Sequence, residues 1–222
     1  MTRAFKLGAL ASVFALAACG NDTAFNSDVD ALKDGFKHFR TALKGKAGAE
    51  ASQVSDEMIA ATLASNPRPM SIVTIEDRSS SGIVSLIDAN GAYRTYGNAS
   101  RQALVFHNGL LSATRGLGDD LMSSDIDTAG LIVSRKDGQA TRVSRYLDGE
   151  GKTIEARMTC SVSVGENKTV GLGTGRVVSE ACTSDGADIN NSYVVDGQGR
   201  VLWSRQWHGH GNGYLVVQPI RL

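Results

Sequence analysis

The sequence has little proline, little cysteine, few aromatic residues and no excess of charge of either sign. Its 23 Lys and Arg residues balance 23 Asp and Glu residues, which gives no electrostatic reason to expect nucleic-acid binding. Three prolines, 25 glycines and 6% aromatic residues favour a turn-rich β protein over a disordered chain. The 222 residues are enough for one domain with a sizeable core.

No apolar run in the first residues is long enough to cross a bilayer, yet the chain begins with the pattern of an export signal. Arg3 and Lys6 supply positive charge, and a short apolar stretch follows from Leu7 to Ala18. Leu16-Ala17-Ala18-Cys19 looks like a lipobox, in which the cysteine thiol accepts a diacylglyceryl group before cleavage. The alternative is an ordinary secretory signal followed by a chance cysteine.

We therefore predict a signal peptide over residues 1–18 and a lipid anchor on Cys19. Each buried methylene of an acyl chain contributes about 0.8 kcal/mol, so several chains together hold a protein firmly on a membrane. Gly20 stands where an aspartate would favour retention in the inner membrane of enteric bacteria. The predicted location is the outer membrane, with the folded part facing the periplasm.

Only two cysteines remain after Cys19, an even pair in an oxidising compartment. We expect Cys160 and Cys182 to form a disulfide, with two buried free thiols as the alternative and no zinc spacing to suggest a metal site. If Thr159–Val164 pairs with Val177–Cys182, the two sulfurs lie opposite each other. In that arrangement the glycine-rich piece from Gly165 to Gly175 becomes a long loop.

The remaining chain divides into a tether, a helical segment and a strand-rich part. Residues 19–28 are small and polar, and read as a flexible tether. Apolar residues from Val29 to Leu43 recur at helical spacing, and Ser55 can cap a second helix containing Met58, Ile59 and Leu63. We assign residues 29–66 to a helical segment that forms one globular unit with a β domain over residues 67–222.

Tight-turn signals dominate from residue 70 onward. Asn90-Gly91, Asn108-Gly109, Asp137-Gly138 and Asp196-Gly197 each separate two apolar or β-branched runs. The third of these turns places Leu131-Ile132-Val133 in a strand. Four hairpins without strand–helix–strand alternation predict a mainly β, antiparallel meander rather than a parallel nucleotide-binding sheet.

Two stretches resemble the YjbF/GfcB lipoproteins, which are associated with group 4 capsules and exopolysaccharides. Residues 106–121 (FHNGLLSATRGLGDDL) contain the Asn-Gly turn, the Thr-x-Gly-Leu and the acidic turn of that family's core motif. Residues 201–207 (VLWSRQW), followed by Gly213-Tyr214, look like the family's ending. With the lipobox and the N-terminal helical segment, the resemblance spans most of the chain after the signal. The pair His208 and His210 has no place in that pattern.

This resemblance implies a role in secretion or assembly of an extracellular polysaccharide at the outer membrane. It implies partners among the export proteins, namely a second periplasmic protein and an outer-membrane β-barrel. It also implies a strongly curved antiparallel sheet or open barrel-like meander with one or two N-terminal helices. It carries over no catalytic residue and no cofactor.

The candidate binding residues are Arg115, Asp119, Asp120, Trp203 and Trp207. Arg115 can meet an acidic sugar or a partner's carboxylate with bidentate geometry, and the two aspartates can accept sugar hydroxyls. The alternative is a structural turn, in which glycines supply unusual backbone angles and Asp119 caps the turn at Leu121. The tryptophans lie four residues apart on one strand face and can stack on sugar rings, with core packing as the alternative.

Other patterns carry less. His208 and His210 share a strand face but lack further metal ligands nearby in the sequence, so we predict no metal site. The glycine-rich residues 171–176 lack the ending of a phosphate-binding loop. Neither a Gly-x-Ser-x-Gly elbow nor a persuasive pair of carboxylates is present.

We therefore predict a non-enzymatic lipoprotein of polysaccharide export that binds partner proteins, and direct binding of glycan stays an open alternative. A lipid or lipoprotein carrier with an apolar cavity is the first alternative, and a glycan-processing enzyme is the second.

Overall fold

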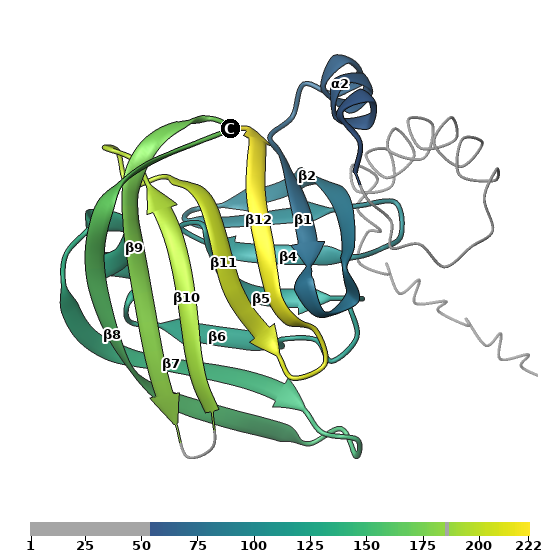
Figure 1. Ribbon diagram of the computed structural model, residues 1–222. Coiled ribbons are helices and arrows are strands. Elements are labelled where there is room, and N and C mark those ends of the chain that lie inside the picture. Colours follow the sequence, from purple (N-terminus) through teal and green to yellow (C-terminus); the bar gives the residue numbers. More distant parts are fainter. Residues whose placement is uncertain (1–53, 185–186) are drawn as a thin grey trace, which may run out of the picture.

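The computed structural model describes residues 54–184 and 187–222 as one antiparallel sheet rolled into a barrel (Figure 1). The sheet has 12 strands in the order β5-β4-β3-β2-β1-β12-β11-β10-β9-β8-β7-β6. Its two edge strands, β5 and β6, lie next to each other, and the backbone N–H of Thr114 in β5 donates to the carbonyl of Leu121, two residues before β6 begins. The barrel is thus nearly closed, as the resemblance implied.

Each strand pairs with strands next to it in sequence, except that β1 pairs with β12 and so joins the two ends of the meander. The helices are α2 (Asp56–Ser65), the short 3-10 helix η1 (Glu76–Arg78) and α3 (Ala129–Ser134). The strands are β1 (Met70–Ile75), β2 (Ser80–Asn90), β3 (Tyr93–Gly97), β4 (Ala103–His107), β5 (Leu110–Arg115), β6 (Ser123–Ile126), β7 (Gly138–Leu147), β8 (Thr153–Val170), β9 (Gly173–Ser184), β10 (Ala187–Val195), β11 (Val201–Gly209) and β12 (Gly213–Arg221).

Three of the four predicted hairpins are present. Asn108 and Gly109 both have positive φ, 52° and 83°, as a type I′ turn requires, and His107 pairs directly with Leu110. The β2–β3 turn is shifted by one residue, because Asn90 pairs with Tyr93 and the loop is Gly91 and Ala92. The β10–β11 connection spans residues 196–200 rather than two residues.

The hairpin predicted at Asp137-Gly138 is wrong, because the preceding apolar run is helical. Leu131, Ile132 and Val133 belong to α3, which ends where Arg135 adopts φ 53° and donates back to the carbonyls of Ile132 and Leu131. Ile132 is fully buried in the core. A short apolar run fits a buried helix as well as a strand, and here its contacts with the barrel core decide.

The predicted long loop at Gly165–Gly175 is also wrong, although the predicted register is right. Cys160 pairs with Cys182, and β8 and β9 stay paired as far as Val170 opposite Gly173. A shift in register between Val164 and Asn167 absorbs the extra residue, which is how a β-bulge keeps a ladder going. The hairpin therefore closes on Gly171 and Leu172, and its end curves over the top of the barrel in Figure 1.

Helix α2 confirms the second predicted helix. The Ser55 hydroxyl accepts from the backbone N–H of Met58, and Asp56 and Glu57 lie in the first turn. The predicted signal peptide, Cys19, the tether and the helix over Val29–Leu43 lie outside the described residues. No helix that the structure describes is long and apolar enough to cross a membrane.

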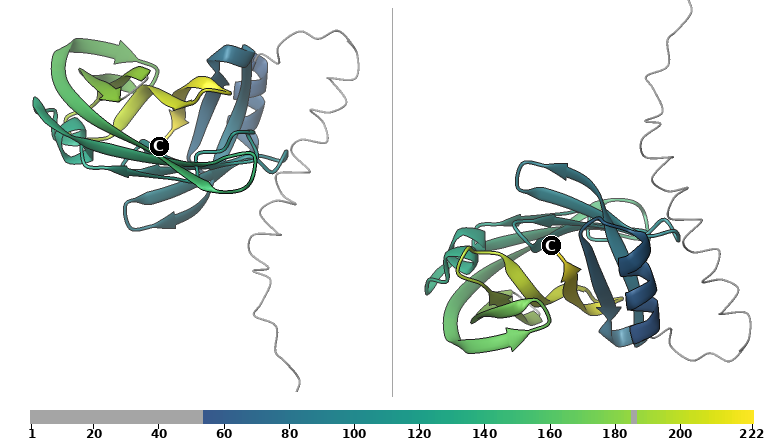
Figure 2. Two further views of the ribbon diagram at one scale, coloured as in Figure 1. Left: turned by 90° about the horizontal axis from the view of Figure 1, so that it is seen from below. Right: turned by 90° about the horizontal axis from the view of Figure 1, so that it is seen from above.

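The barrel has two different ends, and Figure 2 shows the molecule from below and from above. One, here called the cavity end, carries the turns at residues 91–92, 108–109 and 196–200 together with Leu222. The other, here called the motif end, carries η1, the β5–β6 loop over residues 116–122 and the β11–β12 turn over residues 210–212. Between the two ends the interior is packed with apolar and hydrogen-bonded polar side chains.

Candidate functional site

A cavity of about 830 Å³ opens at the cavity end of the barrel. This volume lies in the range of roughly 300–1,000 Å³ that ligand pockets occupy. Strands β1, β2, β3, β4, β11 and β12 contribute to its walls, together with the end of α3 and the β10–β11 turn. Arg94 and Arg200 line the cavity, and none of the described lining residues is Asp or Glu.

Arg94 is exposed, but its place in the β3–β4 ladder puts it on the same face of the sheet as core residues. It pairs with Phe106, and Tyr96 two residues later pairs with Leu104, so both side chains share the face of two core residues. Burial raises the pKa of Tyr96, and the positive charge of Arg94 acts in the opposite direction. The Arg94 guanidinium donates to the carbonyls of Gly91 and Tyr93, and no ion pair joins it to a described residue.

Arg200 is positioned by the β10–β11 turn. Its Nε donates to Asp196 Oδ2 at 2.7 Å, and the other oxygen of Asp196 accepts from the backbone N–H groups of Gln198 and Arg200. Burial alone raises the pKa of Asp196, but these hydrogen bonds and the Arg200 charge outweigh it and hold the pKa below its usual value. The turn is thus rigid, while the Arg200 side chain stays 56% exposed.

The cavity wall also carries buried hydroxyls. Ser204 is 1% exposed and accepts a hydrogen bond from Gln206 Nε2 at 2.9 Å. Gln206 is itself held by the N–H of Leu111 and the carbonyl of Gly109. Ser71 is 4% exposed, and its hydroxyl has no hydrogen-bond partner among the described residues. A bound molecule therefore meets polar groups as well as apolar wall.

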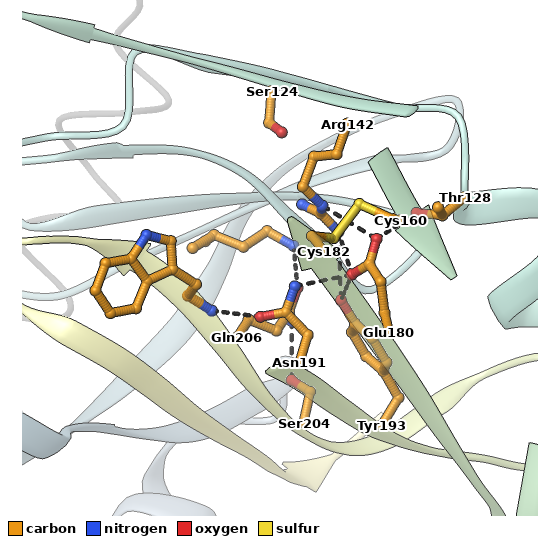
Figure 3. A network of polar contacts seen from close by, with 12 residues as sticks. Ser124, Thr128, Arg142, Cys160, Glu180, Cys182, Asn191, Tyr193, Ser204 and Gln206 are labelled. Atoms are coloured by element: carbon orange, nitrogen blue, oxygen red, sulfur yellow. Dashed lines mark hydrogen bonds and ion pairs between the residues drawn. A yellow bond between two sulfur atoms is a disulfide. The ribbon is translucent and has the colours of Figure 1, made fainter. Parts of the chain in front are cut away.

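A network of polar side chains around Glu180, here called the Glu180 group, lies inside the barrel and is drawn in Figure 3. Arg142 donates to both carboxylate oxygens of Glu180, at 3.1 and 2.9 Å, and the side chains of the two residues are 6% and 0% exposed. Tyr193, Asn191 and Thr128 also donate to this carboxylate. All its lone pairs thus meet donors, as a buried charge requires.

These contacts determine the protonation of the group. Burial on its own raises the pKa of Glu180, but the Arg142 charge and the donated hydrogen bonds hold it below its ordinary value. Burial raises the pKa of Tyr193 well above its ordinary value, and the neighbouring Glu180 charge acts in the same direction. Glu180 is therefore a carboxylate that is paired with the Arg142 guanidinium and lies beside the neutral phenol of Tyr193. Acid–base catalysis by a pair of carboxyl groups needs a second one, and no other carboxylate is among the described residues that contact Glu180.

The predicted disulfide lies next to this group. Cys160 and Cys182 are joined across β8 and β9 with their α-carbons 4.0 Å apart, and both are buried. Their sulfurs also lie near the Glu180 carboxylate, but a sulfur in a disulfide is no thiolate ligand and the carboxylate is saturated by donors. This trio therefore does not hold a metal.

The residues of the predicted turn motif lie at the motif end, away from the cavity. Asp120 accepts from the Thr114 hydroxyl and from the N–H groups of Gly116 and Leu117. Asp120, and not Asp119, thus provides the hydrogen bonds that shape this turn. Arg115 donates to the carbonyls of Thr114, Leu121 and Met122, and Asp119 is exposed with φ 48°. Sugar binding by these residues stays a prediction.

His208 connects the β5–β6 loop to the β11–β12 turn. Thr114 already donates to Asp120, so His208 Nε2 must carry the proton and donate to the Thr114 oxygen, 2.8 Å away. His208 Nδ1 then accepts from Asn212 Nδ2, which also donates to the carbonyl of Gly118. This chain of bonds fixes the β5–β6 loop to the β11–β12 turn.

The expected common face of His208 and His210 is wrong. Strand β11 ends at Gly209, so His208 points into the barrel while His210 lies in the turn, exposed, with its ring against Trp207. Neither histidine meets further metal ligands, because Cys160, Glu180 and Cys182 form the only cluster of His, Cys and carboxylate groups within the described residues.

Trp203 and Trp207 share one face of β11, as predicted from their spacing, and both are partly buried. Lys168 Nζ lies 5.2 Å from the centre of the Trp203 ring. Trp207 packs edge-on against Tyr214 at 5.1 Å and against the cluster of the disulfide and Ile189. Both rings are partly exposed. Their use as sugar-stacking surfaces is untested.

Sequence reasoning missed the cavity residues and the Glu180 group. One signal was available: Glu180 precedes Cys182 by two residues, so both share a strand face, and a buried disulfide implies a buried glutamate. The face on which Arg94 lies could have been predicted in a similar way, because Arg94 and Tyr96 are two residues apart and share one face of the strand. The cavity lies among the turns at residues 91–92, 108–109 and 196–200, and their relative positions in space cannot be predicted from local sequence patterns.

Comparison with known proteins agrees with the resemblance. The family model described as group 4 capsule polysaccharide lipoprotein GfcB, YjbF matches residues 36–219. The crystal structure of the hypothetical lipoprotein YmcC from Escherichia coli (K12) superposes with a TM-score of 0.63 over 79% of this chain and 98% of that chain. At 20% identity this likeness shows the fold alone. A search of curated proteins found no match.

The family match covers the cavity, the Glu180 group and the motif end, and therefore nearly the whole described barrel. The chain belongs to the family of group 4 capsule polysaccharide lipoproteins, GfcB and YjbF.

Proposed function

We propose that this chain is a lipid-anchored protein of the outer membrane that acts in secretion or assembly of an extracellular polysaccharide without catalysing a reaction. In this proposal residues 1–18 are removed, Cys19 carries the lipid, residues 19–28 are the tether, and residues 29–222 form one globular unit. The family match over residues 36–219 is the observation that carries the proposal. The lipid concentrates the barrel at the membrane where its partners are, which raises its effective concentration for them.

The cavity supports binding rather than hydrolysis. Glycosidases use two carboxyl groups about 5–10 Å apart across the bond they cleave. The described residues that line the cavity include arginines, hydroxyls and apolar groups but no acidic side chain. The partners in this proposal are the export proteins of the periplasm and outer membrane, and glycan itself is a further ligand.

Deletion of the gene in a strain that makes the polysaccharide tests the role. We expect secreted polysaccharide to fall, and a plasmid copy to restore it. Crosslinking of the intact lipoprotein in cells, followed by identification of the neighbours, should recover polysaccharide-export proteins. Unchanged polysaccharide in the deletion strain contradicts the proposal, whatever the crosslinked neighbours are.

Membrane fractionation tests the location. Mass spectrometry should find a mature chain that starts at an acylated Cys19, in the outer-membrane fraction. The matched variant Gly20→Asp keeps the cysteine and places an inner-membrane retention signal after it, so it should move to the inner membrane with the lipid retained. A wild-type chain found in the inner membrane, or starting elsewhere without lipid, contradicts this part.

A lipid or lipoprotein carrier is the second candidate, favoured by apolar cavity residues such as Leu86, Phe106 and Val217. An alkyl chain in the cavity would also cover the buried hydroxyls of Ser71 and Ser204 without offering them hydrogen bonds, which costs free energy. Incubation with labelled vesicles discriminates the two candidates, since a carrier extracts lipid and a glycan-binding protein does not.

A further inference from the structure

We infer that the cavity binds a saccharide segment that carries carboxylate groups, with Arg94 and Arg200 as the cationic contacts. This inference rests on the proposed function and names the ligand class of its site. Its starting observation is the imbalance of charge: two arginines line the cavity, and no Asp or Glu side chain among the described residues does. The chain as a whole is neutral, so this excess is local.

Arg94 is the stronger of the two contacts. It lies exposed on the face of β3 that Phe106 shares, and within the described part of the chain its guanidinium donates to two backbone carbonyls, those of Gly91 and Tyr93. Both bonds use the same nitrogen, Nη1. The other guanidinium nitrogens stay available for a carboxylate, which accepts two parallel hydrogen bonds from such a group.

Arg200 offers a second contact from the β10–β11 turn. Its Nε is bound to Asp196, which fixes the direction of the side chain, and both Nη groups have no partner among the described residues. Asp196 itself compensates part of the Arg200 charge.

The other residues that line the cavity suit a sugar ligand better than a lipid or a simple anion. The ring of Tyr96 meets Phe106 edge-on at 5.9 Å and presents an aromatic surface on which the C–H face of a sugar can pack. Ser71 offers a hydroxyl that lacks a protein partner, and the Asn108 side chain likewise has none among the described residues. Sugar hydroxyls can satisfy these groups, whereas an alkyl chain cannot.

Calorimetric titration of the purified full-length lipoprotein in detergent tests the inference. The probes are tri-galacturonate as the acidic saccharide, maltotriose as a neutral saccharide of equal length, and glycerol phosphate as a soluble anion without a sugar ring. We expect binding of tri-galacturonate that weakens with added salt, and no binding of maltotriose. Arg94→Gln and Arg200→Gln should each weaken it by about tenfold, the worth of one charge-assisted contact.

The control is Arg157→Gln, which removes a charge 65% exposed on β8, away from the cavity, and should leave the affinity unchanged. Thermal unfolding of each variant shows whether it is folded, and Arg94→Lys separates charge from geometry, since it should retain only part of the affinity. Equal binding of maltotriose, equal binding of glycerol phosphate, equal binding by the arginine variants, or no binding overturns the inference.

Cells expressing the variants separate this inference from the proposed function. If an Arg94→Gln/Arg200→Gln chain restores polysaccharide to the deletion strain in full, the acidic-saccharide site is unnecessary and the inference fails while the function stands. If deletion leaves polysaccharide unchanged, the function fails irrespective of the titration. A chain that binds tri-galacturonate but fails to restore export when the arginines are changed supports both.

Discussion

At the scale of single residues, the stability of this barrel depends on a buried ion pair, although most protein cores exclude charged side chains. Arg142 and Glu180 are buried together, and three further donors complete the hydrogen bonding of the carboxylate. Such a pair contributes little compared with apolar packing, but removing one partner leaves an uncompensated buried charge. The structure is thus sensitive to loss of either residue alone.

Arg142→Met should lower the free energy of unfolding by about 3–5 kcal/mol at neutral pH, because Glu180 is left charged and unpaired. Without Arg142, burial raises the pKa of Glu180, so the loss should shrink as the pH falls and the carboxyl takes up a proton. Urea unfolding at several pH values measures both effects.

The double variant Arg142→Met/Glu180→Gln is the matched comparison. It removes both charges while the amide oxygen still accepts from the neighbouring donors, and it should recover most of the lost stability. A double variant as unstable as Arg142→Met would contradict the assignment of the loss to an unpaired charge.

His208 gives a pH-dependent prediction at the same scale. Burial lowers its pKa below the ordinary value of 6.5, while the carboxylates of Asp120 and Asp119 raise it and Arg78 lowers it further. A lowered pKa in the folded state means that the neutral ring is favoured there. Its contribution to stability is therefore complete above pH 6.5 and declines as the pH falls from 6.5 toward the folded-state pKa.

Unfolding measured across this pH interval should show that decline in the wild-type protein. His208→Gln removes the titrating group, so the slope of stability against pH below 6.5 should become smaller. His210→Gln changes an exposed histidine of the same turn and should leave the slope as it is. Equal slopes in the wild-type and His208→Gln proteins would refute the buried neutral ring.

At the scale of elements, the β8–β9 hairpin shows what a local pattern can and cannot give. The predicted pairing of Thr159–Val164 with Val177–Cys182 placed the two cysteines opposite each other, and the structure confirms this. The glycines between them indicated a loop, yet the structure keeps them in paired strands with a bulge near Gly165. Glycine weakens a strand without forbidding it, so pairing with the neighbouring strand decides. The run at Leu131 was misassigned for the analogous reason, because burial rather than propensity selects a helix there.

Removal of the disulfide tests the contribution of this hairpin. Cys160→Ala/Cys182→Ala should lose about 3 kcal/mol of stability, since a bond across this separation restricts the unfolded chain by roughly that amount. Reduction of the wild-type protein should cause a similar loss, and the reductant should leave the double variant unaffected. A reductant effect on the double variant would assign the loss to some other group.

At the scale of the whole molecule, the sequence predicted the fold class but not the candidate site. Hairpin signals such as Asn108-Gly109 act between neighbouring strands, and a meander consists of little else, so the antiparallel barrel followed from local patterns. The cavity depends on Arg94, Arg200 and Ser71, which lie far apart in the sequence and meet only because β1 pairs with β12 and the sheet rolls up. The predicted candidates Arg115 and Asp120 instead serve the opposite end, where turn chemistry requires them.

The lipid and the barrel have separate tasks in this view, and Cys19→Ser separates them. The barrel contains its own core, so the variant should unfold at the same temperature as the wild-type domain. Its acyl chains are lost, and each methylene removed costs about 0.8 kcal/mol of membrane affinity, so it should appear in the soluble periplasmic fraction. Because its effective concentration at the membrane then falls, the variant should restore much less polysaccharide to the deletion strain at equal expression. Full restoration by a soluble Cys19→Ser chain would mean that the barrel acts in the periplasm without its anchor, and that the membrane has no part in bringing it to its partners.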